Sequence, residues 1–359
     1  MEFVKFVKFV GSQGSWVRAL SGGRDFSRAY STLESALALS RSGIYQLILR
    51  LALTVALLAA SACVARTPPV LSASAAEQLF STVKDDLVRF EQPSNEARFD
   101  VLAGLLTSRG IPFEVEPFTI EPRKVEPRIQ GRNIVVTLAG DTPEIVIGAH
   151  YDASRLQDGT LSKGVVDNAA SVVILVRLAE AFLKAPPKKQ LRIVFFDMEE
   201  LGLLGSERYV LAQRERKTLA MVNLDVNAFG DTLIFGPRPA SNGAVFEAMR
   251  QTCAELKRSC VEFPRMPPSD DLSFQKAGIP TVSLAMVPEL QAHQLWLLMN
   301  GAKQSGLPQG FTPEILRTIH SASDGTALVD PRALAQVYRA VLSLIGRLDH
   351  EGTTNTTTR

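Results

Sequence analysis

Residues 144–153 decide the fold, and they read EIVIGAHYDA. The apolar run that ends at Ala149 has the length and composition of a buried strand. A second run, Leu191–Phe196, reads LRIVFF, and a third, Ala220–Leu224, reads AMVNL. A helical stretch of apolar residues at 169–183 lies between the first two. Strands that alternate with helices predict a largely parallel sheet covered by helices on both faces.

The flanking sequence fits the same α/β pattern. Helical periodicity covers Ala76–Phe90 and Asn95–Ser108, β-rich runs cover Phe113–Ile120 and Asn133–Leu138, and a further helix begins at about Ser206. We therefore expect a three-layer α/β/α sandwich around a mixed, mostly parallel sheet. The sequence predicts one domain over residues 76–350, preceded by a Pro/Ser/Ala-rich linker at 63–75 and followed by a disordered tail at 351–359.

Composition excludes several classes of protein. The 359 residues are 46% hydrophobic, which is enough for a substantial core. Because 39 Lys and Arg face 37 Asp and Glu without a long basic run, nucleic acid is not an expected partner. The chain has no Gly-x-Ser-x-Gly elbow, phosphate-binding loop or Gly-x-Gly-x-x-Gly fingerprint. The usual sequence support for a serine hydrolase, a nucleotide hydrolase or a dinucleotide enzyme is therefore missing.

The first 62 residues differ from the rest. Leu51–Ala65 has no charge, and as a helix it would span about 22 Å, short of the roughly 30 Å core of a bilayer. This length predicts the apolar region of a signal peptide. The small residues before Cys63 resemble a bacterial lipobox, in which the signal is cut before the cysteine and the cysteine is acylated. Residues 1–40 are too long for the start of a signal peptide and are interpreted as a non-native extension.

Three outcomes remain open for this segment. Cleavage before Cys63 with acylation predicts a lipid-anchored protein of the periplasm or cell envelope. Ordinary signal-peptidase cleavage after Ala62 predicts a secreted protein, and an uncleaved anchor from Ile44 is the third possibility. In an oxidising compartment Cys253 and Cys260 can form a disulfide, with two buried thiols as the alternative. A continuous helix would hold them about 10 Å apart, so a disulfide requires the helix to end between them.

Polar residues follow the predicted strands at the edge where such sheets bind ligands. These candidate residues are His150, Asp152, Asp167, Glu199, Glu200, Asp225 and His320. Two imidazoles and several carboxylates on separate loops supply the nitrogen and oxygen donors of a paired-zinc hydrolase site. Each residue alone has an ordinary structural explanation, such as a helix cap for Asp167 or a charged first helical turn for Glu199. Their order along successive strand ends favours the metal site.

Six motifs between Asn133 and Leu348 resemble a known family. They read GAHYDA (148–153), GVVDNAAS (164–171), FFDMEELGLLGS (195–206), NLDV (223–226), SDDLSFQKAGIP (269–280) and IHSASDGTALVD (319–330). Their order is similar to that in the co-catalytic zinc aminopeptidases, which include secreted bacterial leucyl aminopeptidases; the glutaminyl cyclases are close relatives. The resemblance implies a zinc-exopeptidase fold of the phosphorylase/hydrolase-like type, two Zn²⁺ ions per chain, and peptide substrates with a free N-terminus.

The resemblance also implies a role for each metal ligand. His150, Asp167 and Asp225 would hold one zinc ion. Asp167, Glu200 and His320 would hold the other, so Asp167 would bridge the two ions.

Three further residues take roles from the same resemblance. Glu199 would be the general base that takes a proton from the attacking water and returns it to the leaving amine. Asp152 would fix the tautomer of His150. Asp270 matches the central residue of the family's Ser-Asp-His and is a possible substrate contact, but this chain has Asp271 in place of the histidine. That departure leaves the substrate-side contacts open.

Three functions compete. The leading one is an aminopeptidase, supported by the complete set of ligands and by the run of residues 201–206 after Glu200. The second is a glutaminyl cyclase that uses one zinc ion and converts N-terminal glutamine to pyroglutamate. The third is a non-catalytic receptor or scaffold on the same fold. The long segment 286–318 would be either a lid over a hydrophobic specificity pocket or an insertion packed on the surface of the core.

Overall fold

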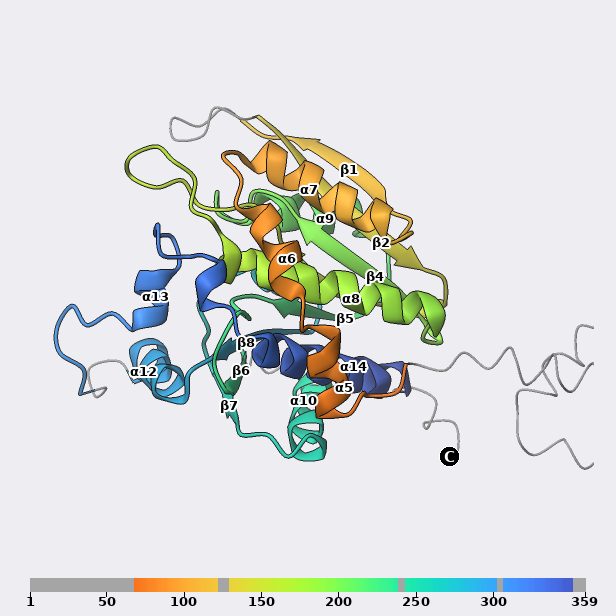
Figure 1. Cartoon of the computed structure of the whole chain (residues 1–359). Helices are drawn as coiled ribbons and strands as arrows, with labels where there is room; N and C mark the ends of the chain where they lie inside the picture. Colours follow the sequence, from red (N-terminus) through yellow and green to blue (C-terminus); the bar gives the residue numbers. More distant parts are fainter. Residues whose placement is uncertain (1–67, 122–128, 238–242, 302–305, 351–359) are drawn as a thin grey trace, which may run out of the picture. The chain divides into compact units, whose positions relative to one another are not determined.

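The computed structural model describes residues 68–121, 129–237, 243–301 and 306–350, all within the unit Arg66–Arg359 (Figure 1). The predicted signal peptide, Cys63 and the predicted tail at 351–359 lie outside these residues. No helix in the described part of the chain is both long and apolar enough to cross a membrane.

The core of the fold is one mixed sheet of eight strands in the order β1-β2-β4-β3-β5-β8-β6-β7. The strands are β1 (Glu114–Thr119), β2 (Gln130–Leu138), β3 (Asp141–His150), β4 (Lys189–Phe196), β5 (Thr218–Leu224), β6 (Thr232–Gly236), β7 (Cys260–Glu262) and β8 (Thr281–Val287). The four central strands, β4-β3-β5-β8, are parallel, whereas β1, β2 and β6 each pair antiparallel with a neighbour. The predicted mixed α/β sheet is confirmed.

Helices cover both faces of this sheet. They are α5 (Ala73–Leu79), α6 (Val83–Leu87), α7 (Asn95–Ser108), α8 (Ala170–Lys184), α9 (Leu204–Ala212), α10 (Gly243–Glu255), α11 (Asp271–Lys276), α12 (Glu289–Asn300), α13 (Glu314–Thr318) and α14 (Pro331–His350), with short turns η1 (Val88–Phe90), η2 (Val165–Ala169) and η5 (Thr326–Leu328). In Figure 1, α7, α8 and α14 lie over one face and α9 lies behind the sheet.

Side chains of strand β3 pack in apolar clusters on both faces of the sheet. Ile145 and Ile147 pack in the large apolar cluster that includes the buried residues of α8 and α14, whereas Val146 points to the other face. There it packs in a smaller cluster with Tyr209 of α9 and Phe274 of α11. Successive side chains of a strand alternate between faces, so a strand buried on both sides reads as a continuous apolar run.

The N-terminal helical region differs from its prediction. The expected single helix over Ala76–Phe90 is divided into α5, α6 and η1, and α5 begins at Ala73, inside the predicted linker. Ser72 accounts for that start, because its hydroxyl accepts a hydrogen bond from the Ala75 N–H (3.2 Å). The Ser81 hydroxyl donates to the Gln78 carbonyl (2.8 Å) where α5 ends. Such local hydroxyl-to-backbone bonds compete with a continuous helix.

The two cysteines of the described chain form a disulfide. Cys253 lies in α10, Cys260 begins β7, and their Cα atoms are 6.3 Å apart. Helix α10 ends at Glu255. The helix therefore ends between the cysteines, as the disulfide alternative requires, and the bond ties α10 to the last strand of the sheet.

Candidate metal centre

The seven candidate residues meet at one edge of the sheet. His150 is the last residue of β3, Glu199 and Glu200 lie in the loop after β4, and Asp225 directly follows β5. Because β4, β3 and β5 are adjacent and parallel, their carboxyl ends lie side by side. Two further segments complete the group: η2 carries Asp167, and the loop after α13 carries His320.

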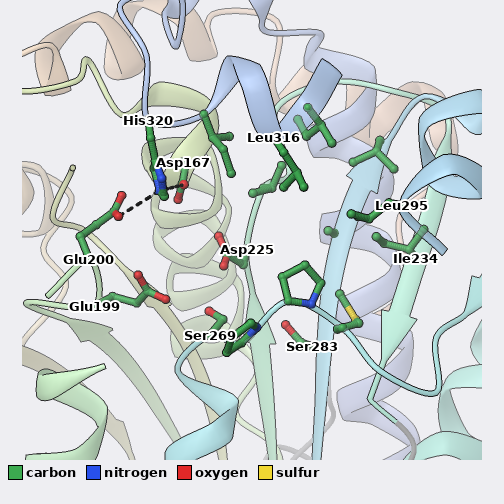
Figure 2. A pocket seen from close by; sticks show the side chains of 18 of the residues that line it. Asp167, Glu199, Glu200, Asp225, Ile234, Ser269, Ser283, Leu295, Leu316 and His320 are labelled. Atoms are coloured by element: carbon green, nitrogen blue, oxygen red, sulfur yellow. Dashed lines mark ion pairs between the residues drawn. The ribbon is translucent and has the colours of Figure 1, made fainter. Parts of the chain in front are cut away.

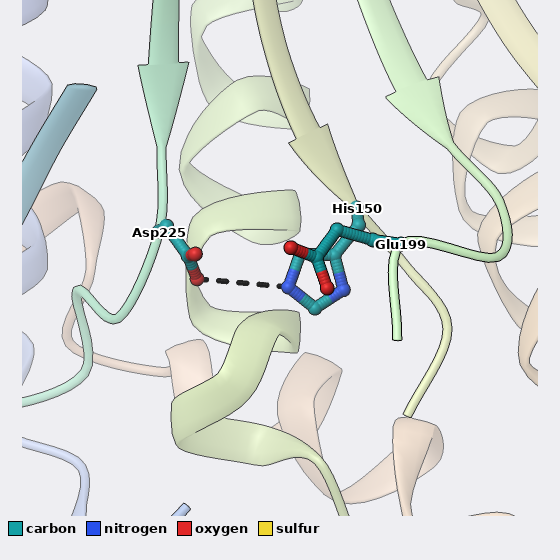
Figure 3. A group of neighbouring side chains, drawn as sticks. All are labelled: His150, Glu199 and Asp225. Atoms are coloured by element: carbon teal, nitrogen blue, oxygen red, sulfur yellow. Dashed lines mark ion pairs between the residues drawn. The ribbon is translucent and has the colours of Figure 1, made fainter. Parts of the chain in front are cut away.

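One half of the site surrounds His150. Its Nε2 atom lies 3.0 Å from Asp167 Oδ1 and 3.6 Å from Asp225 Oδ1. Glu199 approaches from the loop after β4, and His150, Glu199 and Asp225 each offer an atom within 4.8 Å of the others (Figure 3). The sequence predicted that His150, Asp167 and Asp225 lie close together, and they do so in the structure. The structure also places Glu199 beside His150 and Asp225.

The other half surrounds His320. Its Nε2 atom lies 3.1 Å from Asp167 Oδ2 and 3.0 Å from Glu200 Oε2 (Figure 2). Asp167 thus presents Oδ1 to one histidine and Oδ2 to the other. This is the arrangement of a carboxylate shared by two adjacent cation sites.

The donor set fits divalent metal ions. Within the described part of the chain, Glu200 Oε1 is buried and has no hydrogen-bond partner. A buried carboxylate oxygen without a partner is costly, and a cation removes that cost. Imidazole nitrogens and carboxylate oxygens are the donors that zinc accepts. His150, Asp167, Glu200, Asp225 and His320 can therefore hold metal.

Contacts between the two histidines and the neighbouring carboxylates shift the pKa values of the cluster. Hydrogen bonds to Asp167 and Glu200 raise the pKa of His320 to about 11. Burial alone would raise the pKa of Asp167, but its hydrogen bonds to His150 and His320 hold that pKa well below its usual range. Burial, together with the nearby Asp167, raises the pKa of Glu200 to about 7. Metal binding would displace protons from the two imidazoles.

Asp152 orients the ligand loops. Its Oδ1 lies 3.5 Å from His150 Nδ1, and its backbone oxygen lies 3.3 Å from the same atom. The Asp152 carboxylate also accepts hydrogen bonds from the backbone N–H groups of Glu199 (3.1 Å) and Glu200 (3.2 Å). The sequence predicted the first contact only. One buried carboxylate therefore positions both the histidine ring and the two glutamates.

Asp324 and Arg98, which no sequence pattern singles out, hold the backbone around Asp167. Asp324 is fully buried, and its carboxylate accepts hydrogen bonds from the N–H groups of Val166 (2.5 Å) and Asp167 (3.3 Å). Arg98 is also fully buried and donates to the carbonyl of Gly164 (3.0 Å), just before η2. Asp324 lies in the last quoted motif, but its spacing does not separate it from other acidic residues. Arg98 lies outside the quoted motifs.

The role of Asp270 as a substrate contact stays a prediction. It is fully buried directly before α11, and burial raises its pKa to about 7. Its neighbour Ser269 lines the pocket beside the metal centre. The described residues that line this pocket do not include Asp270.

A pocket of about 520 Å³ opens beside the cluster. Asp167, Glu199, Glu200, Asp225 and His320 line its polar end (Figure 2).

The opposite end of this pocket is apolar. Ile234 of β6, Met266, Leu295 of α12, and Ile315 and Leu316 of α13 line it. Helices α12 and α13 therefore contribute to a wall of the pocket, and Leu295 and Ile315 also pack in the main core. A role of the segment 286–318 as a lid stays a prediction.

Residues 133–345 match peptidase family M28. The chain belongs to this family. The family is a family of peptidases. The match begins after α7, so the helical region that supplies Arg98 lies outside the matched segment of this M28 peptidase.

Two curated relatives resemble parts of this M28 peptidase. Aminopeptidase YwaD of Bacillus subtilis is 27% identical over 164 residues, which cover 43% of this chain and 35% of the relative. The alkaline phosphatase isozyme conversion protein of Escherichia coli is 31% identical over 144 residues, which cover 36% of this chain and 42% of the relative. The chain thus spans less than half the length of either relative.

Solved structures share the fold. The zinc aminopeptidase BSAP from Bacillus subtilis superposes with a TM-score of 0.57 at 13% identity, over 78% of this chain and 95% of that one. The glutaminyl cyclase of Porphyromonas gingivalis superposes with a TM-score of 0.58 at 19% identity, over 77% and 98% of the two chains. At these identities the similarity extends to the fold alone.

Proposed function

We propose that this M28 peptidase is an aminopeptidase that removes N-terminal residues from peptides with two zinc ions. The observation that carries the proposal is the position of Asp167, whose two carboxylate oxygens each face a histidine of a separate half-site. One ion would lie with His150, Asp167 and Asp225, and the other with Asp167, Glu200 and His320. When bound, zinc lowers the pKa of water and polarises the scissile carbonyl.

Glu199 is the proposed general base. Its side chain lines the polar end of the pocket, and its backbone N–H is fixed by Asp152 (3.1 Å). Glu200 is adjacent in sequence, but its carboxylate bonds to His320 (3.0 Å). One glutamate is therefore available for proton transfer while the other is committed as a ligand. Glu199 takes a proton from the attacking water and delivers it to the leaving amine nitrogen.

The pocket supports action at the end of a peptide. Its polar end gathers the residues that would hold zinc, and zinc held there would accept the nitrogen lone pair of the neutral α-amine of an unblocked N-terminus. A volume of about 520 Å³ lies in the range of small-molecule sites. The N-terminal residue fits there with its side chain toward the apolar wall.

A glutaminyl cyclase is the second candidate, because the cyclase of Porphyromonas gingivalis has the same fold. That reaction closes the side chain of an N-terminal glutamine onto its own amine and releases ammonia without cleaving a peptide bond. The apolar far wall of the pocket provides few partners for a glutamine amide. It suits an apolar side chain better.

The test compares three substrates on zinc-loaded protein: leucine 4-nitroanilide, its N-acetylated form, and a peptide that begins with glutamine. We expect cleavage of the free-amine anilide, no cleavage of the acetylated one, and loss of activity with a chelator that zinc reverses. Release of ammonia from the glutamine peptide without anilide cleavage would establish the cyclase instead. Cleavage of the acetylated substrate would contradict an aminopeptidase.

Export belongs to the same proposal and is supported by the sequence alone. The small residues before Cys63 suggest a mature protein that begins at an acylated cysteine in the periplasm or cell envelope. The intact mass of the membrane-associated form tests this. A mass equal to the unmodified chain from Val64 or from an earlier residue would contradict the lipid anchor.

A further inference from the structure

Arg98 stands in the first turn of α7 as a fully buried cation. Its guanidinium makes four hydrogen bonds to backbone carbonyl groups. Nε donates to Tyr151 (2.7 Å), one terminal nitrogen donates to Phe90 (2.7 Å) and Lys163 (2.8 Å), and the other donates to Gly164 (3.0 Å). The planar fork of arginine is suited to several fixed acceptors at once, whereas lysine offers a single point of contact.

Two of these carbonyls belong to the loops that carry the metal site. Tyr151 lies between His150 and Asp152, and Gly164 directly precedes the turn that carries Asp167. Gly164 has φ +58°, and a Cβ atom there would lie 2.6 Å from the Cβ of Ala153. The two loops are therefore in close contact where the Arg98 guanidinium joins them.

Asn95 acts on the same loop from the same helix. It lies three residues before Arg98, so both side chains share one face of α7. The Asn95 amide donates to the Ala153 carbonyl (3.1 Å) and accepts from the Ala153 N–H (2.8 Å). Both residues lie before the segment that matches the family.

The charge of Arg98 and its hydrogen bonds act on metal binding with opposite signs. A buried cation near the centre repels Zn²⁺, so loss of its charge alone would tighten metal binding. Loss of the hydrogen bonds would release the two ligand loops and weaken metal binding, because ligands are then no longer held in place. The direction of change in zinc affinity therefore separates the two effects.

We propose, on the basis of the proposed metal site, that Arg98 is a positioning residue for the metal centre. It holds the backbone of His150–Asp152 and of Gly164–Asp167 in the arrangement in which His150 and Asp167 meet. Helix α7, outside the family-matched segment, thereby becomes part of the support of the catalytic centre.

The test is a zinc titration of the metal-free protein against a chromophoric chelator, for the wild type, Arg98→Lys, Arg98→Met and Arg192→Met. Arg192 is a matched control, because it is also buried and pairs with Glu144 (3.1 Å). Glu144 lies six residues before the end of β3, about 20 Å from His150 along the strand.

We expect both Arg98 variants to lose zinc affinity about 10- to 100-fold, the range seen when residues that orient ligands are removed. Arg192→Met is expected to bind zinc as the wild type does. The visible spectrum of the cobalt(II)-loaded protein should change in Arg98→Lys and not in the control. Wild-type zinc affinity in Arg98→Lys, or tighter zinc binding in Arg98→Met, would show that Arg98 affects the metal centre only through its charge. Either result would overturn the proposal. An equal loss in Arg192→Met would do the same.

Asn95→Ala covers the case in which the Arg98 variants do not fold. It removes the contact with Ala153 without a change of charge, and we expect a several-fold loss of zinc affinity. Unchanged affinity would overturn the proposed role of α7. Absence of zinc binding in the wild type would instead overturn the proposed function, so the two failures are distinct.

Discussion

Asp271 is a buried acid at the position where the family resemblance led us to expect a histidine. It is 3% exposed, and Gln275 donates a hydrogen bond to its Oδ2 (2.6 Å). Burial, reinforced by the nearby carboxylates of Asp270 and Asp225, raises its pKa to about 8 even though the Gln275 bond lowers it. In the metal-free protein the folded state thus holds a proton on Asp271 at pH 7, whereas the unfolded chain does not.

Asp271→Asn should therefore change the pH dependence of stability. The contribution of Asp271 to the free energy of unfolding is fully present below the pKa that Asp271 has in the unfolded chain. It is lost as pH rises toward about 8, because in this range only the folded state binds the proton. The slope for one proton is at most about 1.4 kcal/mol per pH unit. Urea unfolding of chelator-treated protein measures this between pH 4 and pH 8. The free energy of unfolding of the variant should increase relative to that of the wild type as pH rises. A constant difference across this range would contradict the assignment.

At the scale of residues, the sequence predicted the candidate metal ligands but not the residues that hold the ligand loops in place. Asp167, Glu200 and His320 stood in motifs whose order indicated a metal site, and the structure brings them together. Asp324 and Arg98 act through the backbone of other segments, at separations of 158 residues (Asp324 to Val166) and 53 residues (Arg98 to Tyr151). No local pattern marks such contacts, because any buried polar residue can satisfy a distant backbone group.

At the scale of elements, α12 and α13 determine the far wall of the pocket. Leu316 of α13 lines it, and we expect Leu316→Glu to lower kcat/KM for leucine 4-nitroanilide at least about 10-fold. The same change should favour substrates with N-terminal lysine or arginine, because it introduces a negative charge. Steady-state kinetics over an aminoacyl-anilide panel measures both effects.

Leu290→Glu is the matched control, because Leu290 of α12 is 69% exposed. It should leave the substrate preference unchanged. The same preference in wild type and Leu316→Glu would show that the N-terminal side chain does not enter this part of the pocket.

The success of element prediction followed the strength of the local pattern. The apolar runs became β3, β4 and β5, and the predicted helix at Asn95–Ser108 has the same bounds as α7. The run over Ala76–Phe90 was wrong as one helix, because a single periodicity cannot reveal the break at Phe80–Thr82. The position of β8 between β5 and β6 arises from pairing between distant segments, which strand propensity does not encode.

At the scale of the whole molecule, the metal centre links parts of the chain that are 170 positions apart, from His150 to His320. Each zinc ion that binds only the folded protein stabilises it by about 4 kcal/mol at a thousand-fold excess over its Kd. Removal of both proposed ions should therefore lower Tm by about 16 °C, at roughly 2 °C per kcal/mol for a domain of this size. Calorimetry with and without chelator measures the shift.

Zinc added back to the chelated protein should restore Tm, whereas magnesium should not, because magnesium prefers oxygen ligands and retains its waters. An unchanged Tm after complete removal of metal would show that the loops are held without it.

Zinc content and turnover of leucine 4-nitroanilide, measured together for Glu199→Gln, separate a general base from a metal ligand. We expect two zinc ions per chain, as in the wild type, with kcat lower by about 10²- to 10⁴-fold, because a general base is lost while the ligands remain. Turnover near the wild-type rate would contradict the role of Glu199 as the base. Loss of zinc together with activity would make Glu199 a ligand with His150 and Asp225, and the proposed mechanism would be wrong.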